Sequence, residues 1–214
     1  MSEPNQPPTS PAPSETPVPL RGGFWKRPAT LAIALAAITF VVYAPVLRHD
    51  FVDYDDGQYV VGNSHVQSGL TWEGVKWSFR SGEASNWHPL TWLSHMLDVT
   101  LFGKNAGGHH LTSLALHCLN AALVFILLQR LTDKQWLSLV VAGLFALHPL
   151  HVESVAWVSE RKDVLSACLG LLSLWAYAKH VAGDKGHVTG HSGVFVAHVT
   201  CHKSHVTSSK YVPW

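Results

Sequence analysis

The chain has 214 residues, of which 47% are hydrophobic and only 14% are charged, and its formal net charge is +1. Because a soluble domain carries about 25% charged residues, this deficit predicts an integral membrane protein. The small net charge, without a basic cluster, argues against a nucleic-acid partner. The three cysteines, an odd number, indicate neither a disulfide framework nor a thiolate metal site.

Residues 1–28 are rich in proline, serine and threonine, and we expect a disordered cytoplasmic tail, since this composition cannot bury a core. The first apolar run follows at residues 29–47, which carry no charge and are long enough to cross a bilayer. A cleaved secretory signal peptide is the alternative, but its apolar region usually has about 7–15 residues. The sequence therefore predicts a membrane span here.

Residues 48–110 are polar and mixed, and they predict a large loop outside the membrane. Within it, residues 72–79 and 89–102 each have the apolar spacing of a short amphipathic helix, and leucines recur at this spacing in the second. Helices of this kind often lie in the membrane interface rather than across it.

Three further apolar runs follow the loop, at residues 111–128, 136–147 and 164–178. The first of them can cross a bilayer, whereas the other two are short for a straight crossing. Together with the run at 29–47 they predict an all-α integral membrane fold with about four transmembrane helices. The alternative has two spans, with the shorter runs re-entrant or packed against missing partners.

Basic residues near the ends of the runs indicate the orientation. Arg21, Lys26 and Arg27 precede the first run, and Arg130 and Lys134 lie in the short link between the second and third runs. Both groups fit the cytoplasmic side. The N-terminus is therefore predicted to be cytoplasmic, with the large loop and the polar segment after the third run on the outer side.

The last segment, residues 179–214, differs in character from the rest. It contains six histidines and three unevenly spaced His-Val-Thr triplets, and few of its residues are apolar. We therefore expect a disordered histidine-rich tail after a partial transmembrane domain at residues 29–178. The abrupt change predicts a chain that ended early or gained foreign sequence.

Two adjacent carboxylates, Asp55 and Asp56, follow the first apolar run. A carboxylate can accept the proton of an attacking hydroxyl or hold a divalent cation on a phosphate, and paired acids raise each other's proton affinity. We predict that these two residues are catalytic. The alternative is a solvated turn, in which aspartate is common.

A second polar cluster follows the third apolar run. Within sixteen residues it contains His148, His151, Glu153, Arg161 and Asp163. Ionisable side chains at a membrane face are costly and mark functional sites, and arginine suits the paired donors that hold a phosphate. We predict that these five residues bind substrate on the same side as the aspartate pair. The alternative is a hydrated loop whose salt bridges tie two spans together.

Fifteen histidines leave open a third class, a membrane protein that binds metal or haem. No histidine spacing matches a zinc signature such as H-E-x-x-H, so no metal ligand is predicted. The sequence also has no glycine-rich phosphate loop and no serine nucleophile elbow, which argues against a soluble nucleotide-dependent mechanism.

Five motifs occur in order along the chain: FVDYDD at 51–56, NWHPLTWLSH at 86–95, GHHLT at 108–112, HPLHVESVAW at 148–157 and ERKDVL at 160–165. Together they resemble the N-terminal membrane part of the GT-C-type integral membrane glycosyltransferases that carry tetratricopeptide repeats, which are related to the protein O-mannosyltransferases. The resemblance covers roughly residues 30–178. The order and spacing of the motifs make it far more specific than the aspartate pair alone.

The resemblance implies a many-span helical fold with a large first outer loop, whose acidic motif serves catalysis or donor binding and matches Asp55 and Asp56. It implies a polyprenyl- or dolichyl-phosphate sugar as donor and a protein hydroxyl as acceptor, and it leaves the need for a divalent cation open. The HPLHVE motif would place His148, His151 and Glu153 near the same outer cavity. We expect a multi-pass protein of the bacterial inner (cell) membrane, with a lipid-linked sugar and an acceptor protein or glycan as partners.

Members of this family continue with further spans and a domain of helical repeats, whereas here the pattern stops after residue 178. The sequence therefore predicts part of a membrane glycosyltransferase that transfers a sugar from a polyprenyl phosphate to a hydroxyl acceptor. The alternatives are an inactive truncated membrane fragment and the histidine-based metal- or haem-binding protein.

Overall fold

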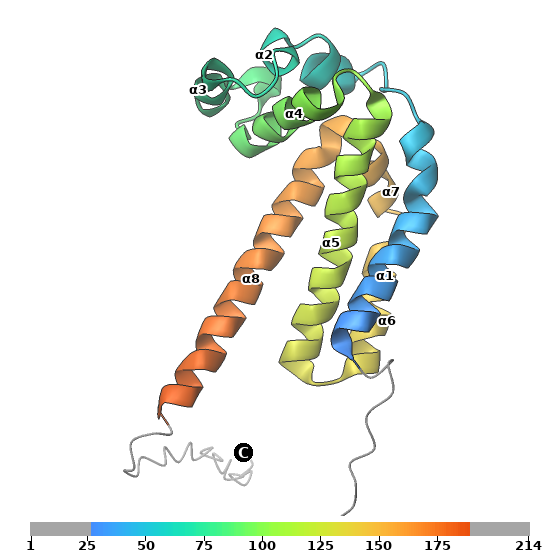
Figure 1. Cartoon of the computed structure of the whole chain (residues 1–214), viewed down its shortest axis with the longest axis vertical. Coiled ribbons are helices and arrows are strands. Elements are labelled where there is room, and N and C mark those ends of the chain that lie inside the picture. The colour runs from blue at the N-terminus through green and yellow to red at the C-terminus, as the bar shows by residue number, and fades with distance from the viewer. Residues whose placement is uncertain (1–26, 189–214) are drawn as a thin grey trace, which may run out of the picture. The chain divides into compact units, whose positions relative to one another are not determined.

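The structure, a computed structural model, describes residues 27–188 and the side chains of residues 27–181. Helices are the only regular secondary structure in this range (Figure 1). The chain divides into two compact units, residues 1–176 and 177–214. The described part of the second unit is the end of helix α8 (Arg161–Val188). The segment predicted as a histidine-rich tail thus starts within this helix, and its later part lies outside the described residues, as does most of the N-terminal tail.

Three helical segments are long and apolar enough to cross a membrane: Pro28–Arg48, Ala106–Thr132 and Val158–Val181. The first comprises α1 (Pro28–Tyr43) and the 3-10 helix η2 (Ala44–Arg48), the second is α5, and the third lies mostly in α8. A shorter apolar helix, α6 (Gln135–Leu147), follows α5. The prediction of an all-α, multi-pass membrane protein is confirmed.

Local sequence signals set the ends of these helices. Pro28 is the first residue of α1, where its missing N–H is not needed. α5 begins after Asn105, whose side chain accepts a hydrogen bond from the N–H of Gly108 at 3.4 Å. The same helix ends at Asp133, which takes the left-handed conformation with φ 56°.

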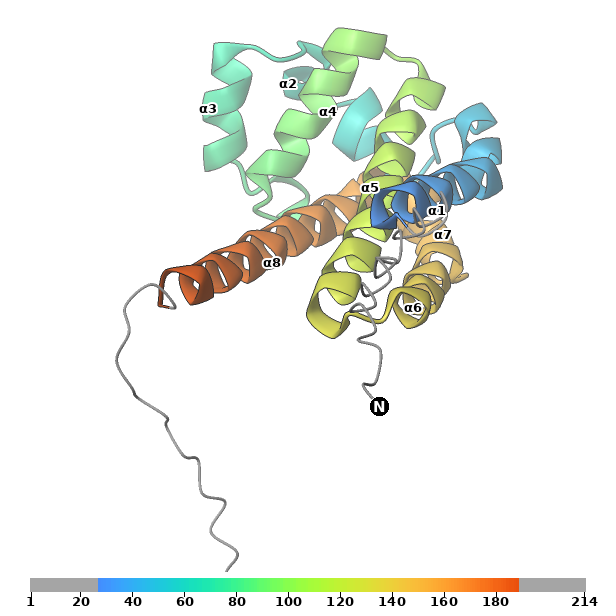
Figure 2. The ribbon, with the colours of Figure 1, turned by 60° about the horizontal axis from the view of Figure 1, so that its bottom comes forward.

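The helices α1, α5 and α6 lie side by side and share a core (Figures 1 and 2). Leu31 and Leu35 of α1 pack with Phe125 of α5 and with Ala142 and Ala146 of α6. Because alanine is small, the backbones of these helices can approach closely, which stabilises helix pairs in lipid, where apolar burial adds little. Exposed apolar side chains cover the outward faces of the same helices.

The loop between α1 and α5 folds into an outer layer of short helices: η3 (Gly57–Val61), α2 (Ser64–Gln67), α3 (Trp72–Arg80), η4 (Glu83–Ser85) and α4 (Pro89–Phe102). The two predicted amphipathic helices are thus present as α3 and α4. Tyr59, Val66, Trp92 and Met96 form the core of this layer together with Val158. Val158 belongs to a second connection, from α6 to α8, which contains α7 (His151–Ala156) and η5 (Val158–Glu160).

Helix α4 buries a different face from the one that carries its leucines. Trp92 and Met96 are fully buried, whereas Leu90, Leu97 and Leu101 are 49%, 45% and 63% exposed. The larger aromatic and thioether side chains fill the outer core, and the leucine face remains open. An exposed apolar face of this kind is what a helix in the membrane interface requires.

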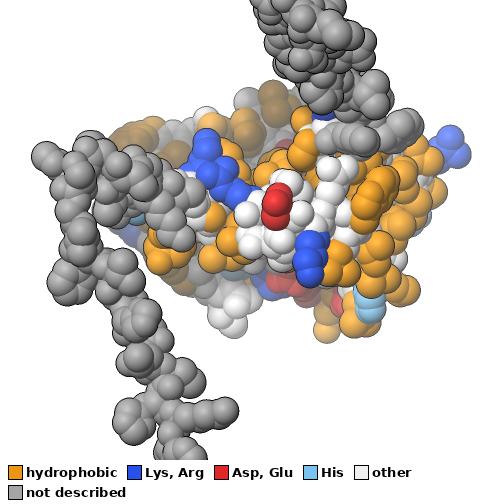
Figure 3. Space-filling view, turned by 90° about the horizontal axis from the view of Figure 1, so that it is seen from below, with side chains coloured by type: hydrophobic (Ala, Val, Ile, Leu, Met, Phe, Trp, Pro, Cys, Tyr) orange, Lys and Arg blue, Asp and Glu red, His pale blue; other side chains and the backbone are white. Residues whose placement is uncertain are grey.

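The end of the first unit opposite the outer layer carries basic side chains. Arg27 precedes α1, and Arg130 and Lys134 flank the link between α5 and α6; all three are exposed. Figure 1 shows these helix ends on one side, and Figure 3, a view from that side, shows Lys and Arg side chains among hydrophobic ones.

Candidate functional site

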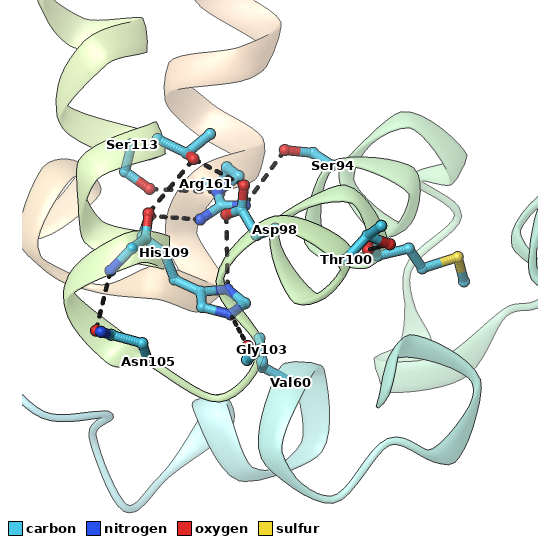
Figure 4. Close-up of polar contacts among 12 residues, drawn as sticks. Val60, Ser94, Asp98, Thr100, Gly103, Asn105, His109, Ser113 and Arg161 are labelled. Carbon is cyan, nitrogen blue, oxygen red and sulfur yellow. Dashed lines mark hydrogen bonds and ion pairs between the residues drawn. The ribbon is translucent and has the colours of Figure 1, made fainter. Parts of the chain in front are cut away.

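The centre of the site is a buried arginine at the start of α8. Arg161 is fully buried and forms an ion pair with Asp98 of α4 (Figure 4). Its Nη2 donates to the backbone oxygen of His109 at 2.6 Å, and its Nε and Nη1 donate to the hydroxyls of Ser113 and Ser94, both at 3.3 Å. One guanidinium therefore joins α4, α5 and α8.

Asp98 is the matching buried anion, and it has two further neighbours on α5. The hydroxyl of Thr112 donates to Oδ1 of Asp98 at 2.7 Å, and Nδ1 of His109 lies 3.6 Å from Oδ2. The other ring nitrogen of His109 donates to the carbonyl oxygen of Gly103 at 3.1 Å. A buried ion pair is tolerated better when the donors and acceptors around it are satisfied. Thr112 meets that need at Oδ1 of Asp98, whereas Nδ1 of His109 makes no hydrogen bond with the described residues.

Asp56 is buried as well, and both of its oxygens are used inside the protein. Oδ2 accepts from the backbone N–H of Val52 and Oδ1 from that of Ser159, each at 2.9 Å. On the same junction, the ring centroids of Tyr54 and Trp157 are 6.0 Å apart. These contacts join the acidic loop to the turn that leads into α8.

Asp55 differs from its neighbour. Its side chain is half-buried, and it makes no hydrogen bond or ion pair with the residues that the structure describes. Asp55 and Asp56 together begin the helical turn that runs into η3. The carboxylate of Asp55 is therefore the member of the pair that is open to a ligand.

Of the four other predicted residues, three lie in the connection between α6 and α8, and Asp163 lies in the first turn of α8. His148, Glu153 and Asp163 are exposed, and His151 is half-buried. Burial, and then the nearby His148, lower the pKa of His151 below its ordinary value. No hydrogen bond or ion pair within the described part of the chain joins these four side chains to Asp55 or Asp56, and their shared role with the aspartate pair stays a prediction.

Arg161 was predicted to bind substrate directly. In the structure its guanidinium is buried, and its donors are used by Asp98, two serines and a backbone carbonyl. In this arrangement it supports the site from within. Asp98 was not predicted, although one signal was available: it is the only Asp, Glu, Lys or Arg in α4, which is otherwise largely apolar.

A group of stacked rings adjoins the ion pair. Tyr59 stacks on His88 and Trp92, with ring centroids 5.5 Å and 5.0 Å apart. His95 is fully buried, and neither ring nitrogen has a partner among the described residues. Burial, and then the charge of Arg161, lower the pKa of His95 well below its ordinary value. No group of three or more His, Cys, Asp or Glu side chains in the described part of the chain is placed to hold a metal ion.

Two hollows border the outer layer. A groove of about 590 Å³ lies between α3, α4 and the first turns of α8, with Lys162 as its cation. Its apolar lining consists chiefly of Phe79, Trp87, Leu90, Leu165 and Leu169. The second hollow, of about 540 Å³, lies beside the acidic loop and is lined by Asp50, Asp53 and Lys104 among others.

The apolar helices and the outer layer above them define a multi-pass helical membrane protein. Its candidate site lies in the loops, which the buried ion pair holds in place. Protein O-mannosyl-transferase Tmtc2 of Drosophila melanogaster is 34% identical over 153 residues, which cover 68% of this chain and 16% of that protein. Human protein O-mannosyl-transferase TMTC1 is 34% identical over 182 residues, which cover 79% of this chain and 20% of that protein. Human protein O-mannosyl-transferase TMTC4 is 32% identical over 177 residues, which cover 73% of this chain and 23% of that protein.

The chain is thus homologous to protein O-mannosyl-transferases, and the predicted resemblance to GT-C-type glycosyltransferases with tetratricopeptide repeats is confirmed. It spans about a fifth of the length of these relatives. No family model matches the chain, and no solved structure matches it.

Proposed function

We propose that the chain forms part of a membrane glycosyltransferase, which transfers a sugar from a polyprenyl-phosphate donor to a hydroxyl group of an acceptor protein. The relatives are named protein O-mannosyl-transferases, which supports a sugar as the transferred group and a protein as the acceptor. The observation that carries the proposal is the open carboxylate of Asp55, held beside the buried and hydrogen-bonded Asp56.

The chemistry requires a base at the acceptor and a stabilised leaving group. The acceptor oxygen attacks the anomeric carbon of the sugar while the bond from that carbon to the phosphate oxygen breaks. A carboxylate takes up the hydroxyl proton, which makes the oxygen a better nucleophile. The leaving group is a lipid phosphate, whose negative charge a nearby cation stabilises. Asp55 supplies the base in this scheme.

The groove beside α8 supports a lipid-linked donor. Its apolar lining follows the first turns of a candidate span, where an isoprenoid chain can enter from the bilayer. Lys162 lines this groove with a side chain that is 32% exposed, and its ammonium pairs with Glu160 at 2.6 Å. A donor phosphate at the groove would share this ammonium with Glu160 or displace the carboxylate from it. Asp163 lines the same groove, whereas substrate binding by His148, His151 and Glu153 stays a prediction.

We also propose that the N-terminus is cytoplasmic. Arg27, Arg130 and Lys134 share one end of the first unit, and basic residues next to spans favour the cytoplasmic side. The outer layer then lies on the opposite side of the membrane. The bacterial cell membrane that the sequence suggested has no support from the relatives, which are animal proteins.

The test is a transfer assay on the chain reconstituted in lipid vesicles, with radiolabelled polyprenyl-phosphate mannose and a serine- and threonine-rich peptide. We expect Asp55→Asn to lower kcat by about 10²–10⁴, the usual contribution of a general base, whereas the exposed Asp53→Asn keeps full activity. A folded wild-type chain that labels no peptide would reject the proposal in favour of the inactive membrane fragment.

A further inference from the structure

We propose that the buried Asp98–Arg161 ion pair positions the acidic loop, by way of Ser159 and Asp56, so that Asp55 alone of the aspartate pair contacts substrate. The role of Asp55 rests on the proposed function. The positioning path rests only on contacts within the chain, so the two parts can fail separately.

The first part of the path runs from Arg161 to Ser159. These residues are two positions apart. The N–H of Glu160 donates to the carbonyl of Trp157 at 3.2 Å, which closes the turn that contains Ser159 directly before Arg161. Val158 and Ser159 are buried to the same degree as Arg161. Because the guanidinium is held by groups on both α4 and α5, it fixes the place of the Ser159 N–H.

An arginine provides this fixation better than an apolar contact would. Its planar guanidinium presents donors in set directions, which here point toward Asp98, Ser94, Ser113 and the carbonyl of His109. An apolar side chain of similar volume could fill the space but would not set the rotation of the first turn of α8.

The second part of the path is the Asp56 carboxylate. It is fully buried, and each of its oxygens accepts one backbone N–H, from Val52 and from Ser159. If Asp56 took a substrate proton, it would weaken both bonds and leave buried N–H groups poorly paired, which is unfavourable. Asp56 is therefore a positioning residue rather than a catalytic one.

The result is a defined place for Asp55. On one side, the rings of Tyr54 and Trp157 lie 6.0 Å apart and hold the loop to the turn before α8. On the other side, Tyr59 and Val60 are buried in the outer core. The backbone is thus held on both sides of Asp55, while its carboxylate stays half-exposed and without a partner among the described residues.

The experiment measures hydrogen exchange at the backbone amides of Val52 and Ser159 in the 214-residue chain in lipid nanodiscs. Asp56→Asn is expected to speed exchange at one of these amides at least tenfold, because the side-chain amide has one acceptor oxygen instead of two. Asp55→Asn and the exposed control Asp53→Asn are expected to leave both amides unchanged.

The ion pair is tested by the same measurement. Asp98→Asn is expected to speed exchange at Ser159 at least tenfold, but it leaves a buried guanidinium unpaired, which strongly destabilises the fold. Two further variants avoid this problem. Asp98→Glu keeps the charge and should restore slow exchange. The double variant Asp98→Asn/Arg161→Gln removes both charges of the pair and should fold with fast exchange. Wild-type exchange at Ser159 in the folded double variant would overturn the positioning path.

Transfer assays on the same preparations separate this inference from the proposed function. If the wild type transfers sugar, Asp55→Asn should lower kcat at least 100-fold with Ser159 exchange unchanged. The folded double variant should lower kcat with little change in the KM of the donor. Full activity of Asp55→Asn would overturn the division of roles. If the wild type transfers nothing, the proposed function fails, and the exchange data still decide the positioning path.

Discussion

The buried polar side chains of the outer layer are of two kinds, paired and unpaired. Asp98 and Arg161 are charged and satisfy each other. His95 is fully buried near them, but its ring nitrogens have no partners among the described residues. Burial, with the added repulsion of Arg161, lowers the pKa of His95 well below its ordinary value, so the ring is neutral in the folded chain.

We expect the fold to lose stability as the pH falls from about 7 to about 5. An unfolded histidine takes up a proton near pH 6.5, whereas folded His95 stays neutral, so the unfolded state binds more protons over this range. The loss reaches about 1.4 kcal/mol per pH unit for one such group. His95→Leu should reduce the slope, because leucine binds no proton and suits an apolar surrounding.

Thermal unfolding in detergent micelles across this pH range measures the effect. The control is His65→Leu, since His65 is exposed and lies in the same outer layer. That variant should keep the wild-type slope. A slope for His95→Leu equal to that of the wild type would show that the ring takes up its proton in the folded state as readily as in the unfolded one.

Two glycines explain how α5 meets its neighbouring elements. A Cβ on Gly107 would lie 2.6 Å from the carbonyl oxygen of Leu47, at the end of the first span, and one on Gly108 would overlap the ring of Phe102 at the end of α4. The first turn of α5 therefore passes directly against two other elements. Only a residue without a side chain allows this approach.

Gly107→Ala is expected to destabilise the chain by about 1–3 kcal/mol, the usual cost of overpacking. The added carbon meets a backbone oxygen, which cannot move aside without displacing the end of the first span. The matched control is Gly143→Ala in α6, where a Cβ would meet nothing within 4 Å. This control should be neutral or stabilising by up to about 1 kcal/mol, because alanine favours helix. Unfolding titrations in mixed micelles measure the free energy of unfolding of both variants. An equal change in the two variants would contradict the close approach of Gly107 to Leu47.

In the first unit as a whole, polar loops and basic helix ends lie at opposite ends of the apolar helices. Tyr54, 74% exposed, and the exposed Glu153 lie in the two connections that contain the predicted clusters. Lys134 is exposed in the link between α5 and α6. If these helices cross a bilayer, the two connections share one compartment and the link lies in the other.

A membrane-impermeant maleimide should therefore label Tyr54→Cys and Glu153→Cys from the same side, and Lys134→Cys from the other. The labelling uses vesicles of known sidedness and a background in which the three native cysteines are replaced by alanine. If positions 54 and 153 are labelled from opposite sides, the two connections cannot form one site.

Much of the helical architecture follows from local sequence alone. The uncharged run at 29–47 corresponds to Pro28–Arg48, and the run at 136–147 to α6. The amphipathic helix predicted at 89–102 is α4, with the same limits. Periodicity and run length are sufficient here because lipid and interface both require backbone groups to be paired within the helix.

Which residues of the site are buried, paired or open depends on how distant segments pack together. Asp98 and Arg161 belong to separate motifs, and no local pattern indicates that they pair in the interior or that α8 begins at Arg161, before its apolar run. In the same way, the sequence presents Asp55 and Asp56 as equivalent. They differ because a backbone N–H from η5, far along the chain, reaches one carboxylate and not the other.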